Sequence, residues 1–242
     1  MILTETILED LPAQVLCLDK RVDHHYETVG SFIGSFDVYE FKVGDGQIWN
    51  VEDYNMIDFD NEFFRKYINW GYGLPDHKIN HFNAFMAHHQ MVRRAKMNNW
   101  KAFLMLEDDA YMTERFHPIW DSLLDSVAGH MKIDCDILYL GWWMGDENDE
   151  FNTQIEDKYK EESKTFEGAF QIHPCEANIG GLHGAIITED IYDTILGLPP
   201  NDPIDCQLNR MNLRRSYITP KIIHTKTMMS NCEGQIIERK DL

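Results

Sequence analysis

Three consecutive carboxylates, Glu107, Asp108 and Asp109, directly follow the apolar run AFLML at positions 102–106. In open α/β sheets, ligands bind beyond the carboxyl ends of the strands. Extended geometry alternates side chains, so Glu107 and Asp109 are predicted on one side, about 7 Å apart, with Asp108 opposite. Two such carboxylates can share a hard divalent cation, directly or through water. The alternative is that the acids precede a helix and are stabilised by its dipole.

Familiar motifs of other enzyme classes do not occur in the sequence. It contains no G-x-G-x-x-G, G-x-x-x-x-G-K-[ST], H-E-x-x-H or G-x-S-x-G segment. This argues against dinucleotide dehydrogenases, P-loop NTPases, zinc proteases and α/β-hydrolases. The acidic triplet is therefore the sharpest local signal of chemistry in the chain.

Short apolar segments that alternate with helical patterns must position the triplet. The predicted strands cover residues 13–18, 36–43, 102–106, 137–140, 184–188 and 217–223. The predicted helices cover residues 22–32, 61–70, 79–98 and 189–196, and one more begins at Pro203. Such alternation predicts a three-layer α/β fold.

The charge balance limits the classes of partner. The 242 residues include 22 Lys and Arg against 41 Asp and Glu, a formal net charge of −19. A surface this negative argues against nucleic acids and against a general attraction to anionic membranes. A small anionic ligand can still bind if local cations or a metal overcome the field.

The cysteines and the apolar runs bear on the compartment. Five cysteines are scattered singly, without a C-x-x-C pair, which fits a reducing compartment. The first residues lack the basic start and apolar run of a secretory signal, and no stretch of 18 apolar residues predicts a transmembrane segment. We therefore expect a cytoplasmic protein.

Several segments, taken in order, resemble glycosyltransferase family 25, which contains lipopolysaccharide and procollagen galactosyltransferases. The closest match is LMLEDDA at 104–110, which is similar to the family's strand ending in Leu-Glu-Asp-Asp. The segment NAFMAHHQ at 83–90 also resembles the family, with Ala87 in place of a family Ser and His88 at the position of the family His. A further segment, GAIIT at 184–188, matches a family strand but lacks its Tyr. The other matching segments are VLCLDKRVD at 15–23, KVGDG at 42–46, DILYLG at 136–141 and PID at 203–205.

The resemblance implies a GT-A fold, a Rossmann-like three-layer sandwich with a mixed sheet. It implies one domain over residues 1–242, with a donor-binding half at about 1–110 and an acceptor-binding half at about 111–242. The implied activity moves a sugar from a nucleotide-sugar, typically a UDP-sugar, to a hydroxyl of a glycan or glycolipid, with inversion. The implied cofactor is Mn²⁺ or Mg²⁺.

The resemblance also suggests roles around that cation. Asp109 is expected to ligate the metal directly, Glu107 directly or through water, and Asp108 to contact the donor ribose or sugar. His224 follows the late strand and is expected as a further ligand, the alternative being an exposed histidine. Asp205 is expected to be the base that takes the acceptor proton, the alternative being a helix N-cap.

Other residues are expected to bind the donor. Asp19, Arg21 and Asp45 follow the first two predicted strands, where the nucleotide should lie, and Arg21 can pair with a phosphate. Ordinary turn chemistry is the alternative for these three residues. His88 is expected near the donor sugar, the alternative being a buried structural histidine.

Two further features have open interpretations. Trp142 and Trp143 follow a predicted strand and either stack on a sugar or pack in the core. Residues 146–167 are strongly acidic. Three interpretations of this segment stay open: a lid over the donor, a loop that faces the acceptor, or a feature that increases solubility.

Two other classes of function compete with a transferase. The first is a non-catalytic module that binds nucleotide-sugars or glycans on the same fold, for which the altered flanking motifs leave room. The second is a metal-dependent phosphoesterase, although no paired metal-ligand motif occurs beyond the triplet.

Overall fold

The computed structural model describes most of the chain in eight stretches. These are residues 1–18, 28–43, 75–144, 169–175, 179–200, 202–225, 228–229 and 236–237. The predicted helix at 61–70 and the acidic segment at 146–167 lie outside these residues.

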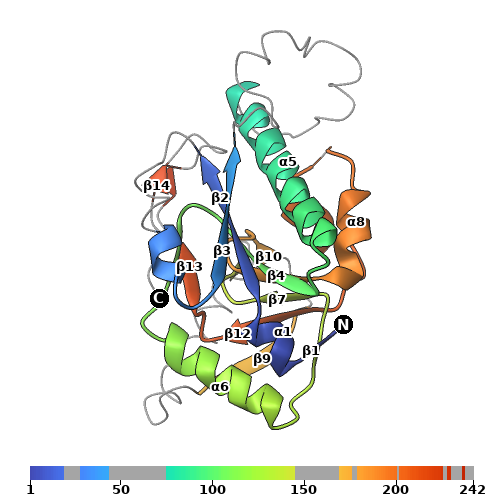
Figure 1. The fold of residues 1–242 in the computed structure, drawn as a ribbon. Coiled ribbons are helices and arrows are strands. Elements are labelled where there is room, and N and C mark those ends of the chain that lie inside the picture. Colours follow the sequence, from blue (N-terminus) through green and yellow to red (C-terminus); the bar gives the residue numbers. More distant parts are fainter. Residues whose placement is uncertain are drawn as a thin grey trace.

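A seven-stranded mixed sheet forms the centre of the fold (Figure 1). The pairs β2–β3, β2–β4 and β7–β12 are parallel, whereas β11 runs antiparallel to both of its neighbours and β9 antiparallel to β12. The strands, in their order across the sheet, are β3 (Asp37–Val43), β2 (Pro12–Leu18), β4 (Ala102–Leu106), β11 (Ala185–Thr188), β7 (Ile137–Tyr139), β12 (Arg215–Thr219) and β9 (Gln171–Pro174). The expectation of an α/β fold with a mixed sheet is therefore confirmed.

Both faces of the sheet are buried, which explains the continuous apolar runs of its central strands. Along β4, Phe103 and Met105 join one hydrophobic cluster, and Leu104 and Leu106 join another on the opposite face. The first cluster includes residues of α5 (Pro75–Met97), α8 (Tyr192–Leu196) and α9 (Ile204–Asn209). The second includes residues of α1 (Glu5–Glu9) and α6 (Phe116–Ala128). Helices on both faces make this a three-layer arrangement.

α6 is amphipathic, yet it was not among the helices predicted from the sequence. It buries Phe116, Ile119, Trp120, Leu123 and Val127 against the sheet, a spacing typical of one helical face. Pro118 lies in the first turn of this helix, where its missing N–H breaks no intrahelical hydrogen bond. The helix begins at Phe116, two residues before this proline.

The predicted strand at 217–223 is two separate strands. β12 ends at Thr219, and β13 (Ile223–Thr225) begins after Pro220 and pairs with β5 (Ala110–Met112) outside the central sheet. Proline has no N–H to donate to a β-ladder, so Pro220 separates the two pairings. As a result, His224 lies within a strand rather than after one.

The remaining strands form short two-stranded pairs. β1 (Ile2–Leu3) pairs with β6 (Ile133–Asp134), and β8 (Trp143–Met144) pairs with β10 (Ile179–Gly180). β14 (Met228–Met229) pairs with β15 (Ile236–Ile237), and a 3₁₀ helix, η3 (Glu189–Ile191), precedes α8. Among the described helices, none combines the length and the apolar character needed to cross a bilayer.

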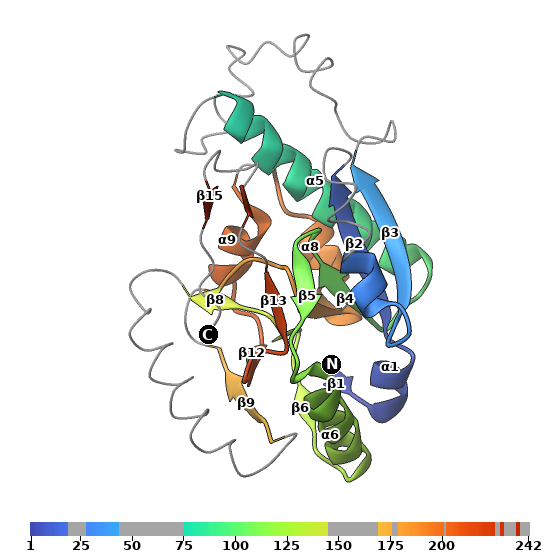
Figure 2. The same cartoon turned by 90° about the vertical axis from the view of Figure 1, so that its left-hand side faces the viewer.

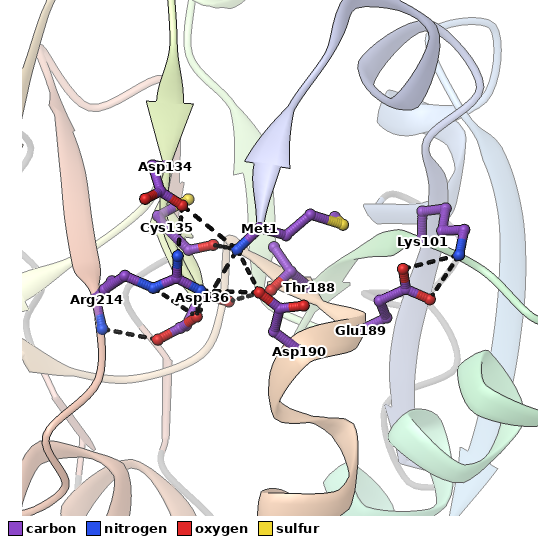
Figure 3. A network of polar contacts seen from close by, with 9 residues as sticks. All are labelled: Met1, Lys101, Asp134, Cys135, Asp136, Thr188, Glu189, Asp190 and Arg214. Carbon is purple, nitrogen blue, oxygen red and sulfur yellow. Dashed lines mark hydrogen bonds and ion pairs between the residues drawn. The ribbon is translucent and has the colours of Figure 1, made fainter.

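An ionic network joins the chain segments at the end of the sheet where β7 begins and β11 finishes (Figure 3). The Asp136 carboxylate, on a residue that is 6% exposed, accepts a hydrogen bond from the Arg214 backbone N–H at 2.8 Å and one from its Nε at 3.1 Å. The Arg214 guanidinium also contacts Asp134 and Asp190. The Met1 amino group reaches Asp190 at 2.5 Å. Arg214 therefore links β6, β7 and the turn before α8.

Strands from before and after residue 110 share the one central sheet. The division into a donor-binding half at 1–110 and an acceptor-binding half at 111–242 stays a prediction.

Candidate functional site

The acidic triplet forms a tight turn at the carboxyl end of β4, the third strand of the sheet. The Ala110 N–H donates to the Glu107 carbonyl at 3.1 Å, and the Thr28 hydroxyl donates to the Asp108 carbonyl at 2.8 Å. The prediction that the triplet continues the strand in extended form is therefore wrong, because the chain turns at Asp108 and Asp109 to enter β5. Asp108 is 5% exposed, whereas Glu107 and Asp109 are partly exposed.

The strand that carries His224 lies directly beside this turn. β5 and β13 lie side by side (Figure 2), and in their antiparallel pairing His224 lies opposite Tyr111 and Thr225 opposite Ala110. The Tyr111 and His224 ring centroids are 5.7 Å apart, and Asp109 immediately precedes β5. The structure thus brings the predicted late histidine next to the acidic turn, through a pairing of residues more than 110 positions apart.

Asp205 lies in the first turn of α9 and binds the segment that leads into β11. Its Oδ2 accepts the Gly181 N–H at 3.1 Å, and its Oδ1 accepts the Cys206 N–H at 2.8 Å. Gly181 has a φ of 77°, in the left-handed region that glycine adopts readily. Because Ala185 pairs with Met105, the residues just before β11 lie at the same end of the sheet as the acidic turn. The N-cap of α9 is Pro203, but Asp205 accepts an N–H of the first turn, so the structural role at the helix start stays open beside the predicted base.

Asn209, four residues further along α9, strengthens this attachment. Its side-chain amide accepts from the Ile179 N–H at 3.2 Å and donates to the Ile179 carbonyl at 2.8 Å. Two side chains on one face of the helix therefore hold two residues of the same extended segment. This fixes the position of the Asp205 carboxylate relative to β10.

His88 lies on α5, close to the acidic turn. The residue is 5% exposed, and within the described part of the chain neither ring nitrogen makes a hydrogen bond. Its Nε2 lies 3.6 Å from Glu107 Oε1, which is too long for a hydrogen bond. Burial lowers the pKa of His88 to about 4. The nearby carboxylate favours the protonated form, but a third of the Glu107 side chain faces water, which screens its charge, so burial dominates.

This pKa predicts a loss of stability in mild acid. Below its ordinary pKa of 6.5, His88 takes up a proton in the unfolded chain but not in the folded protein. The free energy of unfolding should therefore fall as the pH drops from 6.5 to about 4, by about 3 kcal/mol in total. Urea unfolding at several pH values in a chelating buffer measures this slope.

The matched variant for this slope is His88→Gln, whose side chain does not titrate. It should show a flatter dependence between pH 7.5 and 5.5 than the parent protein. An identical slope in the two proteins would show that His88 titrates normally in the folded state.

Sequence reasoning missed His183 and two glycines that pack beside the site. His183 is 3% exposed and lies just before β11. A Cβ on Gly141 would lie 2.7 Å from the Ile223 carbonyl oxygen and 2.9 Å from His183 Cδ2, and one on Gly184 would lie 2.8 Å from Ile223 Cγ2. Three chain segments, including β13, therefore meet so closely that neither glycine position has room for a side chain. The only sequence signal is that each glycine adjoins an apolar strand.

Other predicted site residues are placed elsewhere or lie outside the described residues. Trp142 is 1% exposed, and its indole N–H donates to the Ile218 carbonyl at 2.8 Å, so the sugar-stacking interpretation of this residue is wrong. The side chain of Trp143 lies outside the described part. The same holds for Asp19, Arg21 and Asp45.

The carboxylates of the turn fit a cation that takes part of its coordination from a ligand. Within the described residues, no group of three or more His, Cys, Asp or Glu side chains comes together as a complete metal site. Mg²⁺ and similar ions are commonly held by one or two carboxylates together with substrate phosphates and water. The turn offers two partly exposed carboxylates of this kind, Glu107 and Asp109, and the described residues around them do not form a closed structural site.

Comparisons with known proteins give no family assignment. No protein-family model matches the chain, and no curated protein matches it. Among solved structures, the chain is similar to A197 from STIV, with a TM-score of 0.40 and 7% sequence identity over 96% of each chain. A similarity at this level identifies neither a family nor an activity.

Proposed function

We propose that the protein is a metal-dependent glycosyltransferase with a GT-A fold, which moves a sugar from a nucleotide-sugar to a hydroxyl of a glycan or glycolipid. The observation that carries the proposal is the arrangement around the acidic turn. Glu107 and Asp109 end a central strand, His224 lies on the strand beside them, and Asp205 holds the segment at the same end of the sheet.

Electrostatic repulsion opposes the binding of a diphosphate donor to this protein. The formal net charge of −19 repels phosphates, and the acidic turn adds to the repulsion. Mn²⁺ or Mg²⁺ held by Asp109 and Glu107, with His224 as a further candidate ligand, would neutralise the diphosphate and the charge that develops on the leaving nucleoside diphosphate.

Asp205 is the group that we assign as general base. The acceptor hydroxyl oxygen attacks the anomeric carbon while the bond between this carbon and the donor phosphate oxygen breaks. The electron pair of the broken bond leaves with the nucleoside diphosphate. The hydroxyl proton moves to the Asp205 carboxylate, as the base carboxylate of inverting glycosidases takes a proton from water. The Gly181 and Cys206 N–H groups hold the carboxylate oxygens and so fix the direction from which the proton is taken.

The test incubates the full chain with a panel of nucleotide-sugars and Mn²⁺ and measures free nucleoside diphosphate. Metal-dependent release, accelerated by added glycans and slowed at least tenfold in Asp205→Asn, supports the proposal. Binding of a nucleotide-sugar without turnover, even with acceptors, would indicate a binding module instead. Hydrolysis of simple phosphate esters would indicate a phosphoesterase. Product anomericity by NMR tests inversion.

A further inference from the structure

The environment of His88 differs from that of an ordinary buried histidine. An imidazole inside a protein normally satisfies its polar atoms, as the half-buried His89 does through a 2.6 Å contact between its Nε2 and the Ile195 carbonyl. In the described residues, both ring nitrogens of His88 are buried without a hydrogen-bond partner. An imidazole left in this state is costly unless a ligand completes its contacts.

The neighbour of His88 identifies the kind of ligand. Metal bonds of about 2.1 Å, at angles between about 90° and 120°, place two ligand atoms roughly 3.0 to 3.6 Å apart. The 3.6 Å between His88 Nε2 and Glu107 Oε1 lies at the upper end of this range. It exceeds hydrogen-bond length, and the two residues come from the buried face of α5 and from the tight turn after β4.

The alternation of β4 accounts for this approach. Met105 contributes to the cluster on the α5 face of the sheet, and Glu107 follows it by two residues. His88 lies on α5 between Phe85 and Met91, which are both buried in that same cluster. The helix that covers the sheet thus presents a nitrogen ligand to the first carboxylate of the triplet.

We propose that His88 Nε2 and Glu107 Oε1 bind one divalent cation together, so that His88 is a metal ligand and not a donor-sugar contact. The inference rests on the cation site of the proposed function. An imidazole ligand favours Mn²⁺, Co²⁺ or Zn²⁺ over Mg²⁺, whose preferred ligands are oxygens. Asp109, phosphate oxygens and water would complete the coordination, since the described residues do not themselves come together as a closed site of three or more ligands.

The test is pulsed electron paramagnetic resonance of Mn²⁺ added alone to the full chain, which detects nitrogen bound directly to the ion. The parent protein is expected to show histidine nitrogen coupling, and labelling with ¹⁵N-histidine should change its pattern. His88→Gln should reduce this coupling and weaken Mn²⁺ binding at least tenfold, while Mg²⁺ binding changes less. His89→Gln is the matched control and should leave both unchanged, because that imidazole is already engaged by Ile195.

The outcomes separate this proposal from the wider function. Absence of nitrogen coupling in the parent, or coupling that is lost in His224→Gln but unchanged in His88→Gln and His88→Asn, overturns the assignment of His88. Near-UV circular dichroism checks that each variant is folded. Nucleotide-sugar turnover without His88 coupling leaves the transferase proposal intact, whereas His88 coupling without turnover supports the cation site and contradicts the transferase.

Discussion

Replacing Asp109 with asparagine should lower metal-dependent release of nucleoside diphosphate by a factor of about one hundred or more. The change keeps the size of the side chain but removes the negative charge that holds the cation against the diphosphate. Loss of a single group that stabilises developing charge typically costs about 10²- to 10³-fold in rate. The measurement compares initial rates of donor hydrolysis at saturating Mn²⁺ in the parent and the variant.

Asp121→Asn is the control for this experiment. Asp121 is an exposed carboxylate on α6, so its removal changes the net charge by the same amount. Its rate should stay within twofold of the parent rate. Equal activity in Asp109→Asn and Asp121→Asn would remove Asp109 from the mechanism and with it the main support for a metal-bound diphosphate.

Asp136→Ala is expected to have the largest effect on stability, a loss of about 3 kcal/mol in the free energy of unfolding. The carboxylate is buried and accepts both the backbone N–H and the guanidinium of Arg214. Its removal leaves the partly buried Arg214 N–H without this acceptor and weakens the hold on a cation, which costs several kcal/mol when the cation is fully buried. We take the lower part of that range because about half of the Arg214 side chain is exposed. Urea unfolding followed by circular dichroism measures the change.

Asp134→Ala is the matched control, since Asp134 contacts the same guanidinium at 2.5 Å but has a 55% exposed side chain. Exposed ion pairs contribute little, so a loss below about 1 kcal/mol is expected. If both variants lost the same amount, burial of Asp136 would not be the source of its contribution.

Much of the fold was predictable because its central strands are strong local signals. Apolar runs such as 102–106 are buried on both faces and bounded by charges or glycine, so their type and limits follow from local sequence. The turn of the acidic triplet was not predictable in this way. It depends on the Thr28 hydroxyl, which reaches the Asp108 carbonyl from 80 positions earlier in the chain.

The candidate site was predictable in its residue types but not in its contacts. The triplet, His224 and Asp205 follow from sequence and from a family resemblance that stays a prediction. Their proximity depends on the β5–β13 register and on the Asp205–Gly181 contact, both of which join distant segments. Gly141 gave only a weak signal, its place after an apolar strand, because its importance lies in how closely the Ile223 carbonyl and the His183 ring approach it.

The β5–β13 pairing has a consequence for biosynthesis. All seven strands of the central sheet precede residue 220, but His224 follows them. A chain growing from the ribosome, at about 5 to 20 residues per second, can therefore have the whole sheet outside the exit tunnel before the histidine beside Asp109 emerges. The pairing that places His224 beside the acidic turn is therefore completed only after every strand of the central sheet has been synthesised.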